Sequence, residues 1–293
     1  MRDRTRISRF WIESDLLFGL SGKIILSQKT FDPVGPGYYF GWYTDLGSTV
    51  KSNYVTGELA FILRYQPKAV YVLDGIRRFP VNFNKYPVFT IEYDRGFKGF
   101  LDGEFNYNKI VANIMHRFNI GGLGSIGYEF TYSKVMNQLP YPLLIVLAGN
   151  QSIFRTNRTF NLMNYDEFVQ NEALELNLNY HMNGFILNKF PLIKKLQWRT
   201  VVGGRCAFGS FNYKQNGFYD PINNKDAILP DSINGNPLTK FQSLSYDKPY
   251  IEISYGVENI FRFLRIDFIH RLTWLKNPGV RPFGIKISGV FRF

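Results

Sequence analysis

The sequence lacks the features that define several large classes of protein. A single cysteine, Cys206, excludes an internal disulfide framework and a cysteine-based zinc cluster. No apolar run approaches the roughly 18 to 20 residues of a membrane-spanning helix, because the best candidate, 139–149, is short and contains two prolines. The chain has no dense block of Lys and Arg and no recognition-helix or RNA-binding signature. These absences exclude a bundle of membrane helices and lead us to expect no nucleic-acid partner.

Aromatic residues and positive charge are abundant instead. Phe, Trp and Tyr make up 17% of the chain, and the formal net charge is +12. A basic balance of this size suits an anionic partner such as lipopolysaccharide or phospholipid, although a merely basic surface would give the same count. The first residues, 1–15, are basic but lack the apolar stretch of a secretory signal, so we expect a mature or truncated chain with an added Met.

Most of the chain alternates between apolar and polar residues with the period of a β-strand. In 173–183 the even positions are Leu, Tyr and Met, whereas the odd positions are mainly Asn, Glu and His. The final residues, 283–293 (FGIKISGVFRF), alternate in the same way. Because successive side chains of a strand point to opposite faces, each such segment predicts a ribbon with one apolar and one largely polar face.

The alternation predicts twelve strands, at 15–27, 37–45, 54–65, 69–77, 86–97, 105–119, 124–136, 173–184, 195–209, 250–258, 263–274 and 282–293. Many have about nine to thirteen residues, the length that a tilted strand needs to cross a bilayer and longer than is usual in soluble sheets. No segment predicts a convincing amphipathic helix.

Loop lengths give an independent test, because bacterial outer-membrane barrels alternate short periplasmic turns with longer external loops. With the C-terminus in the periplasm, the external connections are 275–281, 210–249 and 137–172. The periplasmic connections are then 259–262, 185–194 and 120–123. Both long connections fall on one side, as a barrel requires.

A soluble β-sandwich would accommodate the same polar faces. It explains less well the long strands, the terminal phenylalanine and the rings near strand ends at Trp42, Trp198, Trp274 and Tyr180. In a bilayer only helices and closed barrels satisfy every backbone group. We therefore predict that residues 1–293 form an all-β, transmembrane, antiparallel outer-membrane β-barrel of about twelve strands, with two long external loops at 137–172 and 210–249.

Ionisable residues gather on the predicted inner face: Glu252, Glu258, Arg265, Asp267, Arg271, Arg199 and Arg205. Opposite charges inside a barrel can pair and lock it shut, or they can line a pore. Pairing is the favoured interpretation. An unpaired positive excess would instead give an anion-selective or lipopolysaccharide-contacting lumen.

Other motifs have simpler structural interpretations. GLGSIG at 122–127 matches the glycine pattern of a dinucleotide fold, but a strand-like segment follows it, so we predict a hairpin turn. His116, His181 and His270 lie on different strands and cannot converge on one metal. His270 interrupts an apolar stripe, yet no serine on the neighbouring strands shares its face. We predict no catalytic residues, no metal and no cofactor.

The segment 140–150 (PYPLLIVLAGN) is unusually apolar for an exposed loop. We expect it to fold inward as a plug, to pack against the rim, or to be covered by a partner protein.

Four blocks carry a resemblance to a known family: LPYPLLIVLAGN (139–150), FNLMNYDEFV (160–169), GFILNKFPLIKKLQWRTVVGG (184–204) and PYIEISYGVENIFRFLRIDFIHRLTWL (249–275). With them, the chain resembles a family of outer-membrane barrels of unknown function in diderm bacteria, whose members often carry, and are named after, an upstream carboxypeptidase-like regulatory domain. The resemblance implies no peptidase. It implies an Ig-like periplasmic domain ahead of the barrel, and no segment here matches one.

The C-terminal residues also resemble the terminal-strand signal that barrel-assembly machinery reads. The residues concerned are Phe283, Ile285, Ile287, Phe291 and Phe293.

Three functions remain open from the sequence. The first is a non-enzymatic accessory or structural barrel for envelope assembly, export or uptake, whose external loops contact a protein partner. The second is a small-solute or anion channel, and the third is a membrane-embedded lipid-modifying enzyme. We expect outer-membrane lipids, lipopolysaccharide and the barrel-assembly machinery as further partners.

Overall fold

The computed structural model of the chain is all-β and is dominated by one antiparallel sheet. It describes residues 3–33, 42–43, 50–51, 53–75, 77–80, 86–137, 139, 143–211, 232–233, 236–237 and 242–289. Eleven strands form the main sheet, and each pairs antiparallel with the next along the chain. They are β1 (Asp3–Leu17), β2 (Leu20–Pro33), β5 (Tyr54–Tyr65), β8 (Val88–Gly96), β9 (Tyr107–Asn119), β10 (Ser125–Met136), β13 (Glu172–His181), β14 (Arg199–Ser210), β17 (Tyr250–Ile260), β18 (Leu264–Arg271) and β19 (Phe283–Gly289).

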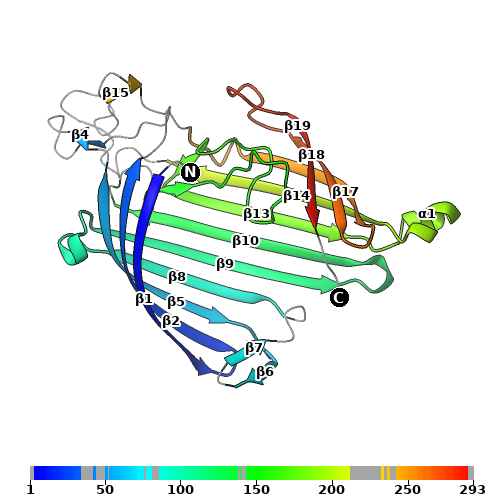
Figure 1. The fold of residues 1–293 in the computed structure, drawn as a ribbon, viewed down its shortest axis with the longest axis horizontal. Helices are drawn as coiled ribbons and strands as arrows, with labels where there is room; N and C mark the ends of the chain where they lie inside the picture. Colours follow the sequence, from blue (N-terminus) through cyan, green and yellow to red (C-terminus); the bar gives the residue numbers. More distant parts are fainter. Residues whose placement is uncertain are drawn as a thin grey trace.

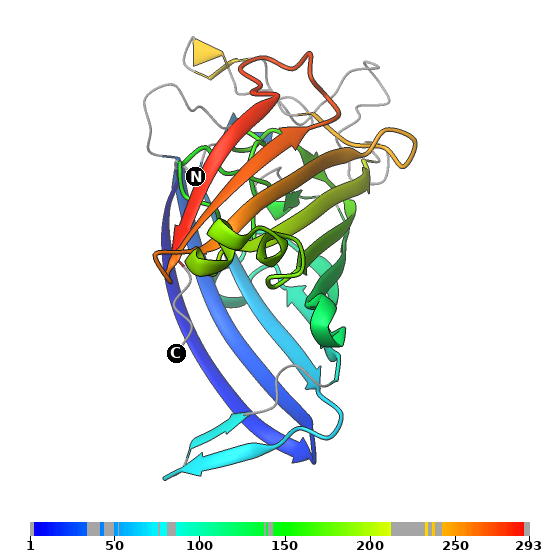
Figure 2. The ribbon, with the colours of Figure 1, turned by 90° about the vertical axis from the view of Figure 1, so that its right-hand side faces the viewer.

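The sheet curls strongly, so that β1 and β19 lie on the same side of the molecule (Figures 1 and 2). Within the described residues, no strand pairing joins β1 to β19. The structure thus shows a curved, barrel-like sheet without showing its closure.

Short elements complete the fold. Two-residue strands form small ladders of their own: β3 (Trp42–Tyr43) with β4 (Val50–Lys51), β11 (Ile145–Val146) with β12 (Val169–Gln170), and β15 (Ser232–Ile233) with β16 (Asn236–Pro237). A hairpin pairs β6 (Tyr71–Asp74) with β7 (Arg77–Pro80). The helical pieces are α1 (Pro191–Leu196) and the 3-10 turns η1 (Phe100–Asp102), η2 (Gly121–Leu123) and η4 (Leu187–Lys189). No helix among the described residues is long and apolar enough to cross a membrane.

The two faces of the sheet follow the sequence alternation. On β13 the even-numbered residues Leu176 and Leu178 are exposed, whereas the odd-numbered residue Ala173 is fully buried. On β17 and β18, Glu252 and Asp267 are buried on the face toward which the sheet curls. The predicted parity of these strands is therefore confirmed. We call the polar, concave side the inner face.

The number and placement of the N-terminal strands were predicted wrongly. The predicted strand 15–27 spans a tight turn between two longer strands, where Gly19 takes a φ of +78° that favours glycine. The edge strand β1 escaped notice because Phe10, Trp11 and Ile12 are consecutive and all exposed, without alternation.

Two further predicted strands do not join the main sheet. In 37–45, only 42–43 is described, and it pairs with Val50–Lys51 alone. In 69–77, β6 turns back at once into β7. Aromatic and β-branched residues favour extended structure in the described parts of both segments, but this propensity does not determine the strand with which they pair. Among the described residues the main sheet has eleven strands, in place of the predicted number of about twelve. Residues 290–293 of the predicted strand 282–293 lie outside the described part.

Connections alternate between two ends of the sheet. Those following β2, β8, β10, β14 and β18 leave from one end, which we call the loop end. Those following β1, β5, β9, β13 and β17 leave from the other, which we call the turn end and which carries α1 (Figure 1). The predicted long connections at 137–172 and 210–249 both start at the loop end, as expected from antiparallel pairing.

Candidate functional site on the inner face

The connection between β10 and β13 folds back onto the inner face. Leu144, Ile145 and Leu147 are buried, and β11 pairs with β12 so that the chain leaves the rim and returns to it. We call residues 143–171 the plug loop. Its apolar composition predicted an inward fold, and the structure bears this out, so this connection is not the exposed external loop expected at 137–172.

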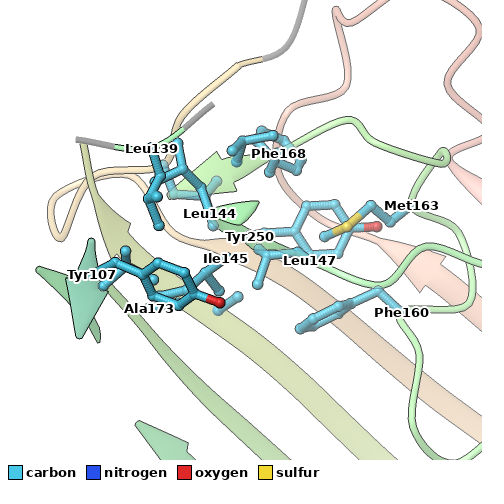
Figure 3. Packing of buried hydrophobic residues seen from close by; sticks show 14 of the residues in the cluster. Tyr107, Leu139, Leu144, Ile145, Leu147, Phe160, Met163, Phe168, Ala173 and Tyr250 are labelled. Atoms are coloured by element: carbon cyan, nitrogen blue, oxygen red, sulfur yellow. The ribbon is translucent and has the colours of Figure 1, made fainter. Parts of the chain in front are cut away.

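Apolar contacts fix the plug loop near the loop end (Figure 3). Phe160 and Phe168 both pack edge-on against Tyr250 of β17, with ring centroids 5.2 and 5.7 Å away. Phe168 also contacts Trp274, at 5.1 Å. The cluster is Tyr54, Tyr107, Val135, Leu139, Leu144, Ile145, Leu147, Phe160, Met163, Phe168, Val169, Ala173, Ala207, Leu244 and Tyr250. Strands from both halves of the sheet therefore share one apolar core with the loop.

Deeper on the inner face, a charged side chain of the plug loop contacts a charged side chain of the sheet. Arg265 binds the buried carboxylate of Asp267 through two hydrogen bonds of 2.7 and 2.6 Å. Arg155 of the plug loop lies 3.4 Å from the same carboxylate and donates to Asn179 at 2.8 Å. A buried charge is tolerated when it is paired, so Asp267 ties the loop to the sheet through Arg155.

Two neighbouring charges hold the backbone of the loop. Arg205 and Glu252 are cross-strand partners on β14 and β17. Glu252 accepts the backbone N–H groups of Asn161 at 2.9 Å and Leu162 at 2.7 Å.

Arg205 instead donates to backbone carbonyls of the same turn, those of Thr156, Asn157 and Thr159. An irregular segment leaves its backbone groups without ladder partners, and these two side chains supply them. Each charge-assisted bond of this kind contributes about 1.5–3 kcal/mol.

A second ion pair anchors the end of the loop nearest β18. Arg271 donates to both oxygens of Glu167, at 3.0 and 2.7 Å, and Asn277 donates to one of them at 2.6 Å. Burial works to raise the pKa of Glu167, but the bonds from Arg271 and Asn277 outweigh it and hold that pKa below its ordinary value. Glu167 is therefore a carboxylate at neutral pH.

The plug loop also occupies part of the free edge of β19. Ile287 donates its backbone N–H to Ile153 at 3.0 Å and accepts the N–H of Arg155 at 2.8 Å. The Lys286 ammonium donates to the carbonyls of Asn150 and Ser152. An unpaired edge strand exposes a row of donors and acceptors, and here the chain's own loop covers some of them.

The structure brings five of the predicted inner-face residues to the plug loop, namely Arg205, Glu252, Arg265, Asp267 and Arg271. Two lie elsewhere. Glu258 accepts a hydrogen bond from His181 at 2.9 Å, and Arg199 lies at the start of β14, near the turn end.

His116, His181 and His270 lie on β9, β13 and β18. Of the predicted C-terminal signal, Phe283, Ile285 and Ile287 lie on β19, with Phe283 and Ile285 exposed. Phe291 and Phe293 lie outside the described residues.

Sequence reasoning missed the residues that face this network from the loop. These residues are far in sequence from their partners on the sheet. The pairs Arg155 with Asp267, Asn161 with Glu252 and Glu167 with Arg271 are each separated by about ninety residues or more. The available signal was local: polar residues in 150–167 interrupt an otherwise apolar loop. A second inner-face cluster was also missed, in which Glu58 binds Lys29, Thr56 and Tyr107.

Two pockets remain beside the plug loop. One of about 660 Å³ is lined in part by Arg117, Glu129 and His181. Another of about 300 Å³ is lined in part by Asn113 and Glu175. The inner face is therefore filled near the loop end and retains space between the loop and the strands.

Comparisons with known proteins identify a family and a fold. The model of the C-terminal domain of a family of unknown function, DUF5686, matches residues 46–212, more than half of the chain. That range contains the blocks at 139–150, 160–169 and 184–204 but not the one at 249–275. No curated protein matches the chain. The carboxypeptidase-like domain implied by the sequence resemblance stays a prediction.

A solved structure supports the barrel-like fold. The chain is similar to BamA from Haemophilus ducreyi, crystallised without POTRA domains 1–3, with a TM-score of 0.54 and 11% sequence identity. The similarity covers 98% of this chain and 55% of that one, so the chain spans about half the length of the BamA chain. At this identity the likeness concerns the fold alone.

Replacing Arg271 by Met tests the anchoring of the plug loop. The change leaves the Glu167 carboxylate without its ion-pair partner, at a cost of about 3 kcal/mol, because both groups are buried. We expect trypsin to cleave the loop at Arg158 roughly a hundredfold faster, since the population of the open loop rises by that factor. The control is Arg281→Met, an exposed arginine in the next connection, and should leave cleavage unchanged. Equal cleavage of the two variants would show that the ion pair does not hold the loop.

Proposed function

We propose that this chain, which belongs to the DUF5686 family of unknown function, is a plugged outer-membrane β-barrel. The part of the family that it matches is the C-terminal domain. Its role is non-enzymatic: an accessory or structural subunit for envelope assembly, export or uptake. The observation that carries the proposal is the plug loop, which is held on the inner face by both apolar and ionic contacts.

The outward face supports a location in lipid. Leu178 of β13, Ile253 and Tyr255 of β17, and Ile285 of β19 all face outward and are between 43% and 50% exposed. A soluble protein rarely leaves so long an apolar stripe in water, whereas a membrane barrel presents one to hydrocarbon. The polar inner face fits the same arrangement.

The plug loop favours a structural role over a channel. An open pore needs a continuous aqueous path lined by polar groups, and here the charged residues of the inner face bind the loop instead. A small-solute or anion channel is the second candidate. The pocket of about 660 Å³ with Arg117 and His181 on its wall favours it, because such a cavity could form part of a path once the loop moves.

We also propose that the chain has no lipid-modifying activity. His270 on the outward face contacts the rings of Tyr255 and Phe283, with centroids 5.7 and 4.9 Å away. Its nearest recorded polar contact is the Tyr255 hydroxyl, 3.5 Å from Nε2. Among the described residues this places no activated nucleophile beside the imidazole.

The proposed partners meet the barrel at different surfaces. Lipids and lipopolysaccharide would surround the outward face, and barrel-assembly machinery would bind β19 and the residues after it. A protein partner would contact the loop end, where Tyr165 and Leu275 are exposed. We expect Tyr165→Glu with Leu275→Glu to remove a stoichiometric envelope protein from the natively purified chain, and Leu123→Glu at the turn end to retain it. If both variants retained the copurifying protein, a partner at the loop end would be contradicted.

Reconstitution tests the membrane location and the plug together. The wild-type chain should insert into phospholipid vesicles and resist external protease. Leu178→Arg should insert poorly, because a charge on the lipid face costs about 2–4 kcal/mol at mid-bilayer, whereas Leu178→Met should insert normally. Equal insertion of both variants would contradict a lipid-facing Leu178.

The same sample, placed in planar bilayers, separates the two candidate functions. We expect the inserted wild type to show no conductance steps. The double variant Arg205→Met with Arg271→Met should conduct, because it loses two anchors of the plug loop. Steady conductance by the wild type would favour the channel instead.

A further inference from the structure

The turn end carries an apolar surface that nothing in the described structure covers. It comes from two connections, 182–198 after β13 and 259–263 after β17, which are joined where Asn259 donates to the Gln197 carbonyl at 2.8 Å. We call six of the exposed apolar side chains here the turn patch: Phe185, Ile186, Phe190, Leu192, Leu196 and Phe261. Leu192 and Phe261 are 81% and 79% exposed, the two highest values among the large apolar residues described. The connection with α1 projects from the end of the sheet (Figures 1 and 2).

The two connections that form the turn patch carry positive charge and no negative charge. Residues 182–199 and 259–263 contain Lys189, Lys194, Lys195, Arg199 and Arg262, and no Asp or Glu. An apolar surface rimmed only by cations is typical of segments that lie at the boundary between acyl chains and anionic headgroups.

A polar pocket opens beside the turn patch. Its volume is about 500 Å³, and its lining includes Asn183, Asn188, Lys194, Trp198 and Arg199. Among the residues that the structure describes, no carboxylate lies within ion-pair distance of Lys194 or Arg199. With Gln197, the pocket therefore offers two cations and three amides to an anion, with an indole at its wall.

The nearest inner-face carboxylate is already engaged. Glu258 is the cross-strand neighbour of Arg199 in the β14–β17 register, but it accepts a hydrogen bond from His181. Arg199 is thus available to a ligand in the pocket. The chemistry of the lining suits a phosphate, because Lys and Arg provide charge-assisted bonds and Asn provides further donors.

The turn patch continues the outward face of the sheet. Leu178 on β13 and Val202 on β14 are both exposed on that face, and these strands lead directly into the connection that carries α1. A ligand whose phosphate occupies the pocket could lay apolar chains along the patch and the strands. Tryptophan, as at position 198, is enriched at this depth of membrane proteins.

From these observations we propose that the turn end binds an anionic glycerophospholipid, with its phosphate in the pocket of Lys194 and Arg199 and its acyl chains on the turn patch. The inference rests on the proposed outer-membrane location, and it adds a specific lipid site at the leaflet facing the turns. A soluble organic phosphate or a periplasmic protein would need the same cations, but neither accounts for exposed Leu192 and Phe261 in continuity with the lipid-facing strands.

Native mass spectrometry of the full chain tests the site. The chain in detergent is given an equimolar mixture of phosphatidylglycerol and phosphatidylcholine. We expect selective retention of phosphatidylglycerol, lowered roughly tenfold in Lys194→Gln with Arg199→Gln, because two cations near the headgroup are lost. Leu192→Ser with Phe261→Ser should also lower retention. Lys276→Gln with Arg281→Gln, which removes two charges at the loop end, should leave it unchanged.

The outcomes separate this site from its alternatives and from the proposed function. Glycerol phosphate is added to a second sample of the same mixture. Its retention in place of the lipid would identify a soluble-anion site and overturn the proposal. A protein that shields Leu192 from labelling in the native complex, in the absence of bound lipid, would also overturn it. Insertion into vesicles is measured on the same samples. A chain that inserts but retains both lipids equally contradicts only the lipid site, whereas a chain that does not insert contradicts the outer-membrane location.

Discussion

The structure depends on the hydrogen bonds that satisfy the irregular backbone of the plug loop, which is buried inside a curved sheet. Loops normally run over the surface, because their backbone groups require water or a partner. The plug loop lies on the inner face, and the side chains of Arg205 and Glu252 replace the missing water. These charges in turn find most of their hydrogen-bond partners in the loop. Sheet and loop therefore stabilise each other, and removing either partner would leave buried groups unpaired.

This dependence explains why ionisable residues sit so close together on β14, β17 and β18. Charges that pair only within the sheet would stabilise the sheet alone. Here Asp267 binds Arg265 in its own strand and Arg155 in the loop, so one carboxylate serves both. The edge of β19 follows the same logic, because Ile287 completes its backbone bonds with Ile153 and Arg155. The loop thus closes part of the inner face and covers part of an open strand edge.

The sequence allowed the local features to be predicted and left the distant ones undetermined. Period-two alternation in β13, β17 and β18 predicted which side chains face inward, because strand geometry fixes that relation between neighbouring residues. The hairpin of β1 and β2 was missed because Phe10, Trp11 and Ile12 do not alternate. Apolar composition predicted that Leu144 and Leu147 would turn inward, but no local pattern connects Asn161 with Glu252. Partners so far apart in sequence are selected by the tertiary fold.

The central claim is that charges on the inner face hold the backbone of the plug loop. Hydrogen exchange of the Asn161 and Leu162 amides, which donate to Glu252, measures this contact directly. The account predicts that both amides exchange as slowly as the paired amides of β17 in the wild type and that Glu252→Ala releases them. Exchange of these two amides at the rate of an exposed loop in the wild-type protein would contradict it.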